Sequence, residues 1–456
     1  MGSVTGSWAE EIETAGRDEL RKLQLEKLNR SLSYCAARSP FYRRKLAGSK
    51  GAGALRFLEE LPELPLTSRA ELEADQRTHG RAGTLLCTDY GAPGDAIGLT
   101  GVKVSATGVP LKAVVSVEDC ASQGKLAARG LAGAGVTPAD YLYVMDFPQF
   151  NLLYLHVGLG SINLGSKSIL AGMERAKRNV RTYAPLFPPS AVYISPSYSK
   201  FVLPLLRESG RRYPIRTVLG WSEPGYSVPS VRETLTAAWQ EVSEAPRVDL
   251  RDVYGMVEVG LLGFSCSQKA GLHGFEDAYL YEVVDPVSGD VLPPGREGEL
   301  VITHLERTAM PLVRYRTGDV TSLTSEPCAC GRTHLRLSGI KGRLSQRLEA
   351  QGKTLYPADL EQALARSGYG GPFNAVTDAG ATPEGLSLDV SKAAMAAMDP
   401  RGVEESCSGE LGVTVRLEVR EDRDLLAFPH RAVKCYPSRD FERLRDAAAR
   451  QWLTES

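Results

Sequence analysis

The sequence predicts an α/β protein: a large N-terminal domain with mostly parallel sheets plus an antiparallel, barrel-like region, and a small α+β domain at the C-terminus. Three observations support this. Between residues 97 and 320, apolar strand-like runs alternate with segments of helical period. Residues 278–325 instead alternate apolar and polar side chains across Gly/Pro turns. At 456 residues the chain is too long for one core and suits two or three domains.

The elements follow in order along the chain. Within residues 7–47, leucines at spacings of three to five predict a helix that ends at Pro40. We expect strands at 141–147, 190–195, 215–220 and 252–256, with helices at 197–210 and 228–242. Beyond the connector come a helix at 358–368 and strands at 386–391 and 413–419. The predicted division is an N-terminal domain 1–340, a hinge connector 341–346 and a C-terminal lid domain 347–456.

Composition narrows the class of protein. The 54 basic and 55 acidic residues nearly cancel, so we expect no nucleic-acid partner. No apolar run approaches the ~20 residues needed to cross a bilayer, and the N-terminus lacks the pattern of a secretory signal, so we expect no membrane partner. Most of the eight cysteines are isolated, which favours a reducing cytoplasm over a disulfide framework.

Two motifs carry acidic side chains at strand ends. In "VYGMVEVG" (253–260), Glu258 follows Tyr254 and Gly255 and suits a magnesium ion that bridges phosphates; the alternative is a turn with a surface glutamate. In "MPLVRYRTGDV" (310–320), Asp319 suits the two hydroxyls of a ribose; the alternative is a turn in which it caps backbone amides. Arg343, in the connector, is a cation that reaches ribose or phosphate.

The order and spacing of these motifs resemble the adenylate-forming ligases, and more narrowly the phenylacetate–coenzyme A ligase family. The residues that carry the resemblance are Tyr254-Gly255-x-x-Glu258, Tyr315-Arg316-Thr317-Gly318-Asp319 and Gly342-Arg343. The resemblance covers nearly the whole chain. Its other segments are "RDELRKLQLEKLNRSL", "SPFYRRKL" and "LPELPLTSRAEL" within 17–72, "SPSY" at 195–198, "SEP" at 222–224, residues 271–303 and "LYPADLEQAL" at 355–364.

The resemblance implies a two-step reaction. A carboxylate attacks the α-phosphate of ATP to give an acyl-adenylate, and coenzyme A or an amine then displaces AMP. Glu258 would bind Mg²⁺, Tyr254 and Gly255 would line adenine and phosphate, and Asp319 and Arg343 would hold the ribose. The small C-terminal domain would be a mobile lid that rotates about the connector between the two half-reactions, and a homodimer is expected.

The chain departs from the family at its phosphate loop and near its C-terminus. Where the family has S-S-G-T-T-G-K-P, residues 103–110 read "KVSATGVP", leaving Ser105, Thr107 and Gly108 to bind ATP. Where the family has a catalytic lysine, this chain has Arg431 in register and Lys434 three residues later. The connector has Ser345 and Gln346 in place of the usual acidic pair.

Three cysteines and a histidine form a candidate metal site. Cys266, His273, Cys328 and Cys330 make a Cys₃His set suited to structural Zn²⁺, with His334 as a substitute ligand. Free cysteines and a packing histidine are the alternative. Some members of the family carry zinc at matching positions, as the resemblance implies.

Aromatic and polar residues suggest an acid-binding pocket. Candidate lining residues for a planar aryl or heteroaryl acid are Tyr154, His156, Tyr198, Trp221 and Glu223. Any one of them is equally well a core residue, and His156 in particular suits a core histidine with satisfied hydrogen bonds. The leading hypothesis is an ATP- and magnesium-dependent aryl-acid ligase of specialised metabolism. The rival is a homologue that no longer adenylates and serves as acyl transferase, cyclase or binding protein.

Overall fold

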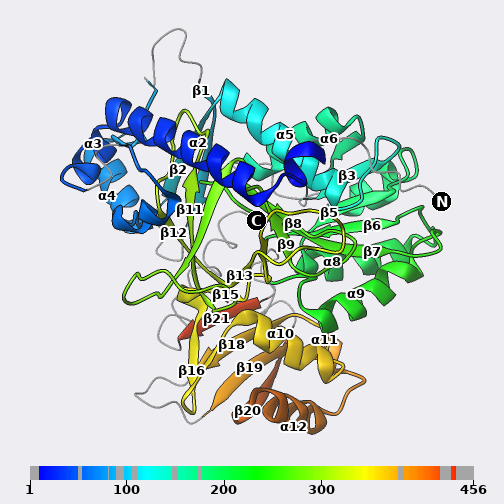
Figure 1. Cartoon of the computed structure of the whole chain (residues 1–456). Helices are drawn as coiled ribbons and strands as arrows, with labels where there is room; N and C mark the ends of the chain where they lie inside the picture. The colour runs from blue at the N-terminus through cyan, green and yellow to red at the C-terminus, as the bar shows by residue number, and fades with distance from the viewer. Residues whose placement is uncertain are drawn as a thin grey trace. The chain divides into compact units, whose positions relative to one another are not determined.

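The computed structural model describes residues 10–49, 54–80, 82–88, 97–104, 110–145, 152–172, 176–377, 385–421 and 433–437. Contacts divide the chain into two compact units. Unit 1 comprises residues 1–176, 189–193 and 251–338, and unit 2 comprises residues 177–188, 194–250 and 339–456. Figure 1 labels most of their helices and strands.

Helices open unit 1. They are α1 (Glu10–Glu13), α2 (Arg17–Arg38), α3 (Pro40–Leu46), the 3₁₀ helix η2 (Leu58–Glu63), α4 (Arg69–His79), α5 (Val117–Gly133) and α6 (Leu152–Leu164). The predicted first helix is confirmed as α2, but Pro40 begins a new helix rather than ending the helical region. Ser39 caps α3 by accepting the Tyr42 N–H at 3.2 Å, and proline suits the first helical position because it needs no N–H there.

The strands of unit 1 form several ladders. Strands β1 (Ile97–Val104) and β2 (Pro110–Ser116) are antiparallel, and β3 (Tyr141–Met145) and β4 (Lys167–Leu170) are parallel. An antiparallel run follows the order β7 (Asp249–Met256, whose first two residues belong to unit 2), β8 (Gly260–Phe264), β9 (Leu272–Gly274), β14 (Arg336–Leu337) and β13 (Leu323–Thr324). The antiparallel region predicted at 278–325 is confirmed as β10 (Tyr279–Val284), β11 (Gly298–His304) and β12 (Tyr315–Thr321).

Unit 2 contains the predicted helices at 197–210 and 228–242. These are α8 (Pro196–Glu208) and α9 (Pro229–Glu241), each with a proline in its first turn. The remaining elements here are η3 (Asn179–Tyr183) and β6 (Thr217–Gly220), while α7 (Ala176–Arg178) and β5 (Ala191–Ile194) straddle the boundary of the units.

The C-terminal part of unit 2 is an α+β fold, as predicted. Its sheet has the order β20 (Val415–Arg420), β19 (Leu386–Ser391), β18 (Phe373–Thr377) and β21 (Val433–Pro437). Helices α10 (Pro357–Arg366), α11 (Lys392–Met395) and α12 (Pro400–Leu411) accompany it, with a hairpin of β16 (Leu348–Ala350) and β17 (Lys353–Leu355). Buried Leu360, Phe373, Leu388 and Cys407 belong to a core cluster formed by this part alone.

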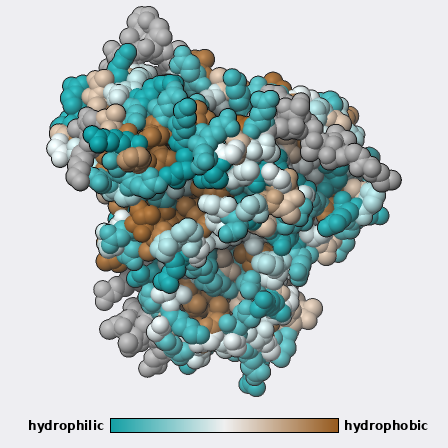
Figure 2. All heavy atoms as spheres, viewed as in Figure 1, coloured by the Kyte–Doolittle hydropathy of each residue, from teal (hydrophilic) through white to brown (hydrophobic). Residues whose placement is uncertain are grey.

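The surface in view in Figure 2 carries mainly hydrophilic residues. Several hydrophobic patches interrupt this face (Figure 2). Across the residues that the structure describes, no helix is both long and apolar enough to cross a bilayer.

Candidate nucleotide and metal sites

Glu258 lies in the tight turn that joins β7 to β8. Tyr254 and Gly255 are still in β7, and residues 257–259 form the turn. A side chain on Gly255 would come within 2.7 Å of the Gly260 carbonyl oxygen and 3.0 Å of Leu153, so this position needs glycine. Glu258 itself is 0% exposed. The alternative of a surface glutamate is therefore wrong.

Two side chains from distant parts of unit 1 approach the Glu258 carboxylate. The Tyr315 hydroxyl donates a hydrogen bond to Oε1 at 3.1 Å, and Arg69 Nη1 lies 3.9 Å from the same oxygen. The buried carboxylate thus has a donor and a nearby cation, as burial of a charge requires, although Arg69 also forms a shorter ion pair with Glu73, at 2.5 Å. Sequence reasoning missed both contacts, although Tyr315 opens the "YRTGD" motif and Arg69 lies in the quoted "LPELPLTSRAEL" segment.

Backbone pairing brings Arg69 to this position. Thr67 lies beside β12: its N–H donates to the Arg314 carbonyl oxygen at 2.8 Å, and its own carbonyl accepts from Arg316 at 2.9 Å. Ser68 then caps α4, with its side chain accepting from the Glu71 N–H and the Glu71 carboxylate accepting in return. Arg69 is the first residue of the helix and is fixed by both constraints.

Asp319 is a second buried carboxylate, 3% exposed, within β12. The Tyr254 hydroxyl donates to its Oδ2 at 2.6 Å, and its backbone N–H donates to Thr317 Oγ1 at 3.0 Å. The Asp319 side chain therefore accepts from a side chain of another sheet. Tyr254 and Asp319 are thus coupled, although the sequence predicted separate roles for them.

The connector belongs to unit 2. Arg343 begins a short 3₁₀ helix, η4 (Leu344–Gln346), and its N–H donates to Gln346 Oε1 at 3.0 Å. Gly342 has a φ of +146°, and a Cβ there would come within 2.4 Å of Pro357 at the start of α10. Through the hydrogen bond from Arg343, the Gln346 side chain caps the start of η4, at a position where the resemblance implies an acidic residue.

The predicted phosphate-loop residues and the two C-terminal basic residues have no described side chains. Ser105, Thr107, Gly108 and Arg431 lie outside the described residues. The paired strand ends Val104 and Pro110 show that residues 105–109 connect β1 to β2. Lys434 is described by its backbone only, opposite Asn374 in the β18–β21 pair.

The candidate pocket residues divide between the units. Tyr154 and His156 are buried on α6 of unit 1. Tyr198, Trp221 and Glu223 belong to unit 2, where Glu223 accepts hydrogen bonds from the backbone N–H of Ser197, at 3.0 Å, and from its hydroxyl. Burial raises the pKa of Glu223, and these bonds oppose the shift. Tyr198 stacks on Phe201 with ring centroids 5.5 Å apart.

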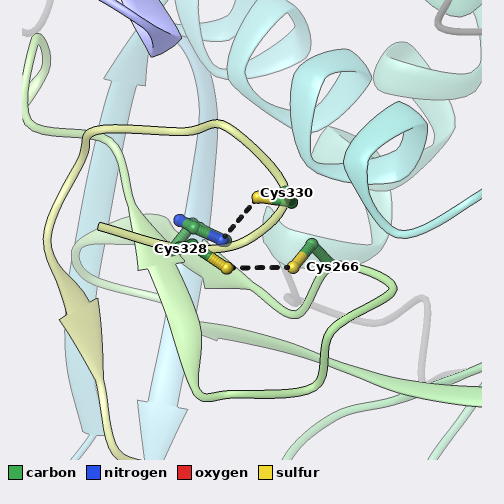
Figure 3. A group of neighbouring side chains, drawn as sticks. Cys266, Cys328 and Cys330 are labelled. Carbon is green, nitrogen blue, oxygen red and sulfur yellow. Dashed lines mark hydrogen bonds between the residues drawn. The ribbon is translucent and has the colours of Figure 1, made fainter. Parts of the chain in front are cut away.

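The four residues of the candidate metal site lie together in unit 1. One donor atom from each of Cys266, His273, Cys328 and Cys330 lies within 4.8 Å of all the others. Figure 3 shows the three cysteines gathered around one point. The sulfurs of Cys266 and Cys328 are 3.8 Å apart, and the Cys330 sulfur is 3.4 Å from His273 Nε2. A tetrahedral zinc ion separates two sulfurs by about 3.8 Å and a sulfur and a nitrogen by about 3.5 Å.

The protonation state of His273 and the hydrogen bonds of His334 both favour His273 as the histidine ligand. Burial lowers the pKa of His273 to about 3, so its imidazole is neutral and ready to bind a metal. The substitute ligand His334 is engaged elsewhere: its Nε2 lies 2.9 Å from the Ile12 carbonyl oxygen and its Nδ1 lies 3.2 Å from that of Gly274. His273 is therefore the histidine of the cluster.

Comparison with known proteins places the chain in a family. No protein-family model matches it. It is 34% identical over 362 residues to a phenylacetate–coenzyme A ligase of Thermus thermophilus, covering 78% of this chain and 77% of that protein. The chain belongs to the phenylacetate–coenzyme A ligase family. A second member, from Aromatoleum evansii, is 29% identical over 364 residues, with 78% of each chain covered.

Solved structures agree with this family assignment. A 2-hydroxyisobutyryl-CoA ligase in its postadenylation state, in complex with R3-HIB-AMP, has a TM-score of 0.84 at 25% identity, covering 96% of this chain and 94% of that one. An open conformation of the same ligase with 2-HIB-AMP and CoA has a TM-score of 0.68 at 26% identity, covering 90% of each chain. This phenylacetate–coenzyme A ligase family member is an enzyme, an adenylate-forming ligase, and the predicted fold class is confirmed.

Proposed function

We propose that the protein activates an aromatic carboxylic acid with ATP and Mg²⁺ as an acyl-adenylate and then transfers the acyl group to coenzyme A. The observation that carries this proposal is the pair of buried carboxylates, Glu258 and Asp319, each held by a tyrosine hydroxyl in the two motifs that define the resemblance. Both carboxylates occupy the positions to which the resemblance assigns Mg²⁺ and the ribose.

The chemistry assigns a task to each group. An oxygen of the acid attacks the α-phosphorus of ATP, the bond to the bridging oxygen breaks, and pyrophosphate leaves. A magnesium ion held by Glu258 would supply charge neutralisation for the phosphates. Tyr315 keeps the Glu258 carboxylate oriented, and Arg69 offsets its charge. Asp319, oriented by Tyr254, would accept hydrogen bonds from the ribose hydroxyls.

The second half-reaction is attack of a thiol sulfur on the acyl carbon, with AMP leaving. Coenzyme A is the proposed acceptor because it is bound with an acyl-adenylate in the related 2-hydroxyisobutyryl-CoA ligase. An amine is the alternative acceptor. We also propose a role in specialised metabolism, a cytoplasmic location and a homodimer. The proposal also includes rotation of a lid formed by residues 347–456 about the connector 341–346.

We assign the Cys₃His cluster to a structural zinc ion. Four protein ligands leave no open coordination position for a substrate, and the cluster joins the loop after β8 to the loop before β14. Elemental analysis of purified protein tests this assignment. We expect close to one zinc per chain, and a value near zero without any chelator treatment contradicts it.

Pyrophosphate release across a panel of aromatic acids tests the ligase activity. We expect release that needs both ATP and an acid. Glu258→Gln should reduce kcat by about 10²–10³, since it removes a charge that acts on the transition state. Glu276→Gln is the matched control, because Glu276 is equally buried but pairs with Arg17 away from the motifs.

The rival function has a distinct outcome. A homologue that no longer adenylates gives no ATP-dependent release with any acid and no ATP binding by calorimetry. That pair of results overturns the proposal and favours an acyl transferase, a cyclase or a binding protein on the same fold.

A further inference from the structure

His156 is a buried histidine without hydrogen bonds. It is 1% exposed on α6, and neither ring nitrogen has a partner among the residues that the structure describes. Burial, with a smaller contribution from Arg307, lowers its pKa to about 3, so the ring is neutral with one N–H donor and one acceptor nitrogen. The satisfied core histidine that the sequence left open is therefore not what the structure contains.

His304 shows what a satisfied core histidine looks like in the same unit. It is 2% exposed, and burial also lowers its pKa to about 3. Its Nε2 lies 2.9 Å from the Val259 carbonyl oxygen, and its Nδ1 accepts from the Leu312 N–H at 3.0 Å. Buried polar groups are normally paired in this way, so the lack of a hydrogen-bond partner among the described residues for either ring nitrogen of His156 needs an explanation.

The start of α6 lies against the Glu258 turn. Leu153 is the side chain that a Cβ on Gly255 would touch, and Leu152 belongs to a small core cluster against which Val257 packs. His156 follows these leucines by three and four residues, so it lies one helical turn away on the same side of α6. The histidine is thus close to the motif that would bind the reacting phosphates.

The charged groups near His156 are already engaged. Arg307 donates to the carbonyl oxygens of Val259 and Val114, each at 3.1 Å. Asp119 accepts from the backbone N–H groups of Thr308, at 2.7 Å, and Ala309, at 3.0 Å. In the described part of the chain, Arg307 Nε has no hydrogen-bond partner and lies 3.5 Å from Asp119 Oδ2. Neither charged group hydrogen-bonds the imidazole, which fits a ligand as the missing partner of its ring nitrogens.

We propose that His156 hydrogen-bonds a neutral hydroxyl group on the body of the acid, which makes hydroxylated aryl acids the preferred substrates. This inference rests on the proposed function and names its substrate class. A hydroxyl both donates and accepts, so it pairs with either nitrogen of a neutral imidazole. A second carboxylate or another charged substituent is disfavoured, because a neutral buried ring cannot compensate its charge.

The test compares phenylacetic acid with its 2-, 3- and 4-hydroxy derivatives, and benzoic acid with the three hydroxybenzoic acids. For the full chain we expect at least one hydroxylated acid to exceed its parent by roughly 10- to 100-fold in kcat/KM for pyrophosphate release. His156→Phe should remove this preference by bringing kcat/KM for the hydroxylated acid down to that of its parent, and His156→Asn should restore part of it.

Stability separates binding from packing. Because His156→Phe removes two unpaired buried nitrogens, its melting temperature without ligand should match or exceed that of the wild type. His304→Phe, the matched control, should melt lower and keep the hydroxyl preference, since its nitrogens are paired within the protein. If His156→Phe keeps the preference, or if the wild type shows none, the role of His156 is refuted.

Calorimetry of the same acids without ATP distinguishes the two proposals. If no acid supports pyrophosphate release but the hydroxylated acids still bind more tightly in a His156-dependent way, the ligase function fails and the assignment of His156 stands. If acids react but their hydroxyl groups make no difference to rate or binding, the ligase function stands and this inference fails. If neither reaction nor His156-dependent binding occurs, both are overturned.

Discussion

The hydrogen bond from Tyr254 to Asp319 gives a direct test of the nucleotide site. Tyr254→Phe removes one hydroxyl that donates over 2.6 Å to a carboxylate only 3% exposed. A hydrogen bond to a charged group is worth about 1.5–3 kcal/mol. If Asp319 holds the ribose in the orientation that Tyr254 sets, the variant should raise KM for ATP by about 10- to 150-fold. KM for the acid should stay within about twofold.

Tyr281→Phe is the matched control for this experiment. The Tyr281 hydroxyl is also buried in unit 1, where it accepts from the Phe275 N–H at 2.9 Å and donates to the Leu262 carbonyl oxygen at 2.7 Å. Its loss should lower the melting temperature and leave KM for ATP unchanged. Steady-state pyrophosphate release at varied ATP measures both variants. A Tyr254→Phe enzyme that is folded and has an unchanged KM for ATP would refute the role of Asp319 in ribose binding.

Three further predictions concern stability and the metal. Arg314→Met should lower the urea midpoint of unfolding, because it leaves the buried Glu282 carboxylate without its cation. Breaking a buried ion pair in this way destabilises a protein by about 3–5 kcal/mol. Gly255→Ala should lower both melting temperature and activity, since its Cβ would meet a backbone oxygen at 2.7 Å that cannot move aside; normal values for both would contradict the packing. Zinc affinity should fall about tenfold per pH unit of acidification for each proton displaced, because burial raises the pKa of Cys266 to about 12 and that thiol must ionise. Competition with a chelator between pH 6 and 8 measures it, and a pH-independent affinity would exclude thiolate ligation.

The sequence predicted the elements that depend on local patterns. The leucine spacing of α2 and the alternation of β10, β11 and β12 both come from residues that are neighbours along the chain. The role of Pro40, which begins a helix and does not end one, also depends on a local feature. A proline after serine suits the start of a helix as readily as the end of one, and Ser39 provides the cap that decides it.

The contacts of the site depend on tertiary structure and could not be predicted in the same way. Arg69 approaches Glu258 because Thr67 pairs with β12, and no spacing in the sequence indicates that pairing. Tyr315 and Glu258 are 57 residues apart, and their contact requires β12 and the β7–β8 turn to meet. The cysteine cluster was predictable because two of its ligands form a local C-x-C pair and Cys266 lies seven residues before His273, and because the family resemblance implies zinc at these positions.

We expect the altered phosphate loop to affect the reaction rate more than nucleotide binding. Glu258 and Asp319 are both buried, each receives a tyrosine hydroxyl, and Glu258 also has Arg69 nearby. These groups lie outside the loop, so they are unaffected by the missing hydroxyls and lysine. Backbone N–H groups of a loop can still bind phosphate whatever its side chains are. The lost groups would act on charge that develops during the reaction, where each such stabiliser is worth about 10²–10³ in rate. We therefore expect a ligase that binds ATP normally in calorimetry and turns over slowly, and weak ATP binding combined with fast turnover would refute this division of roles.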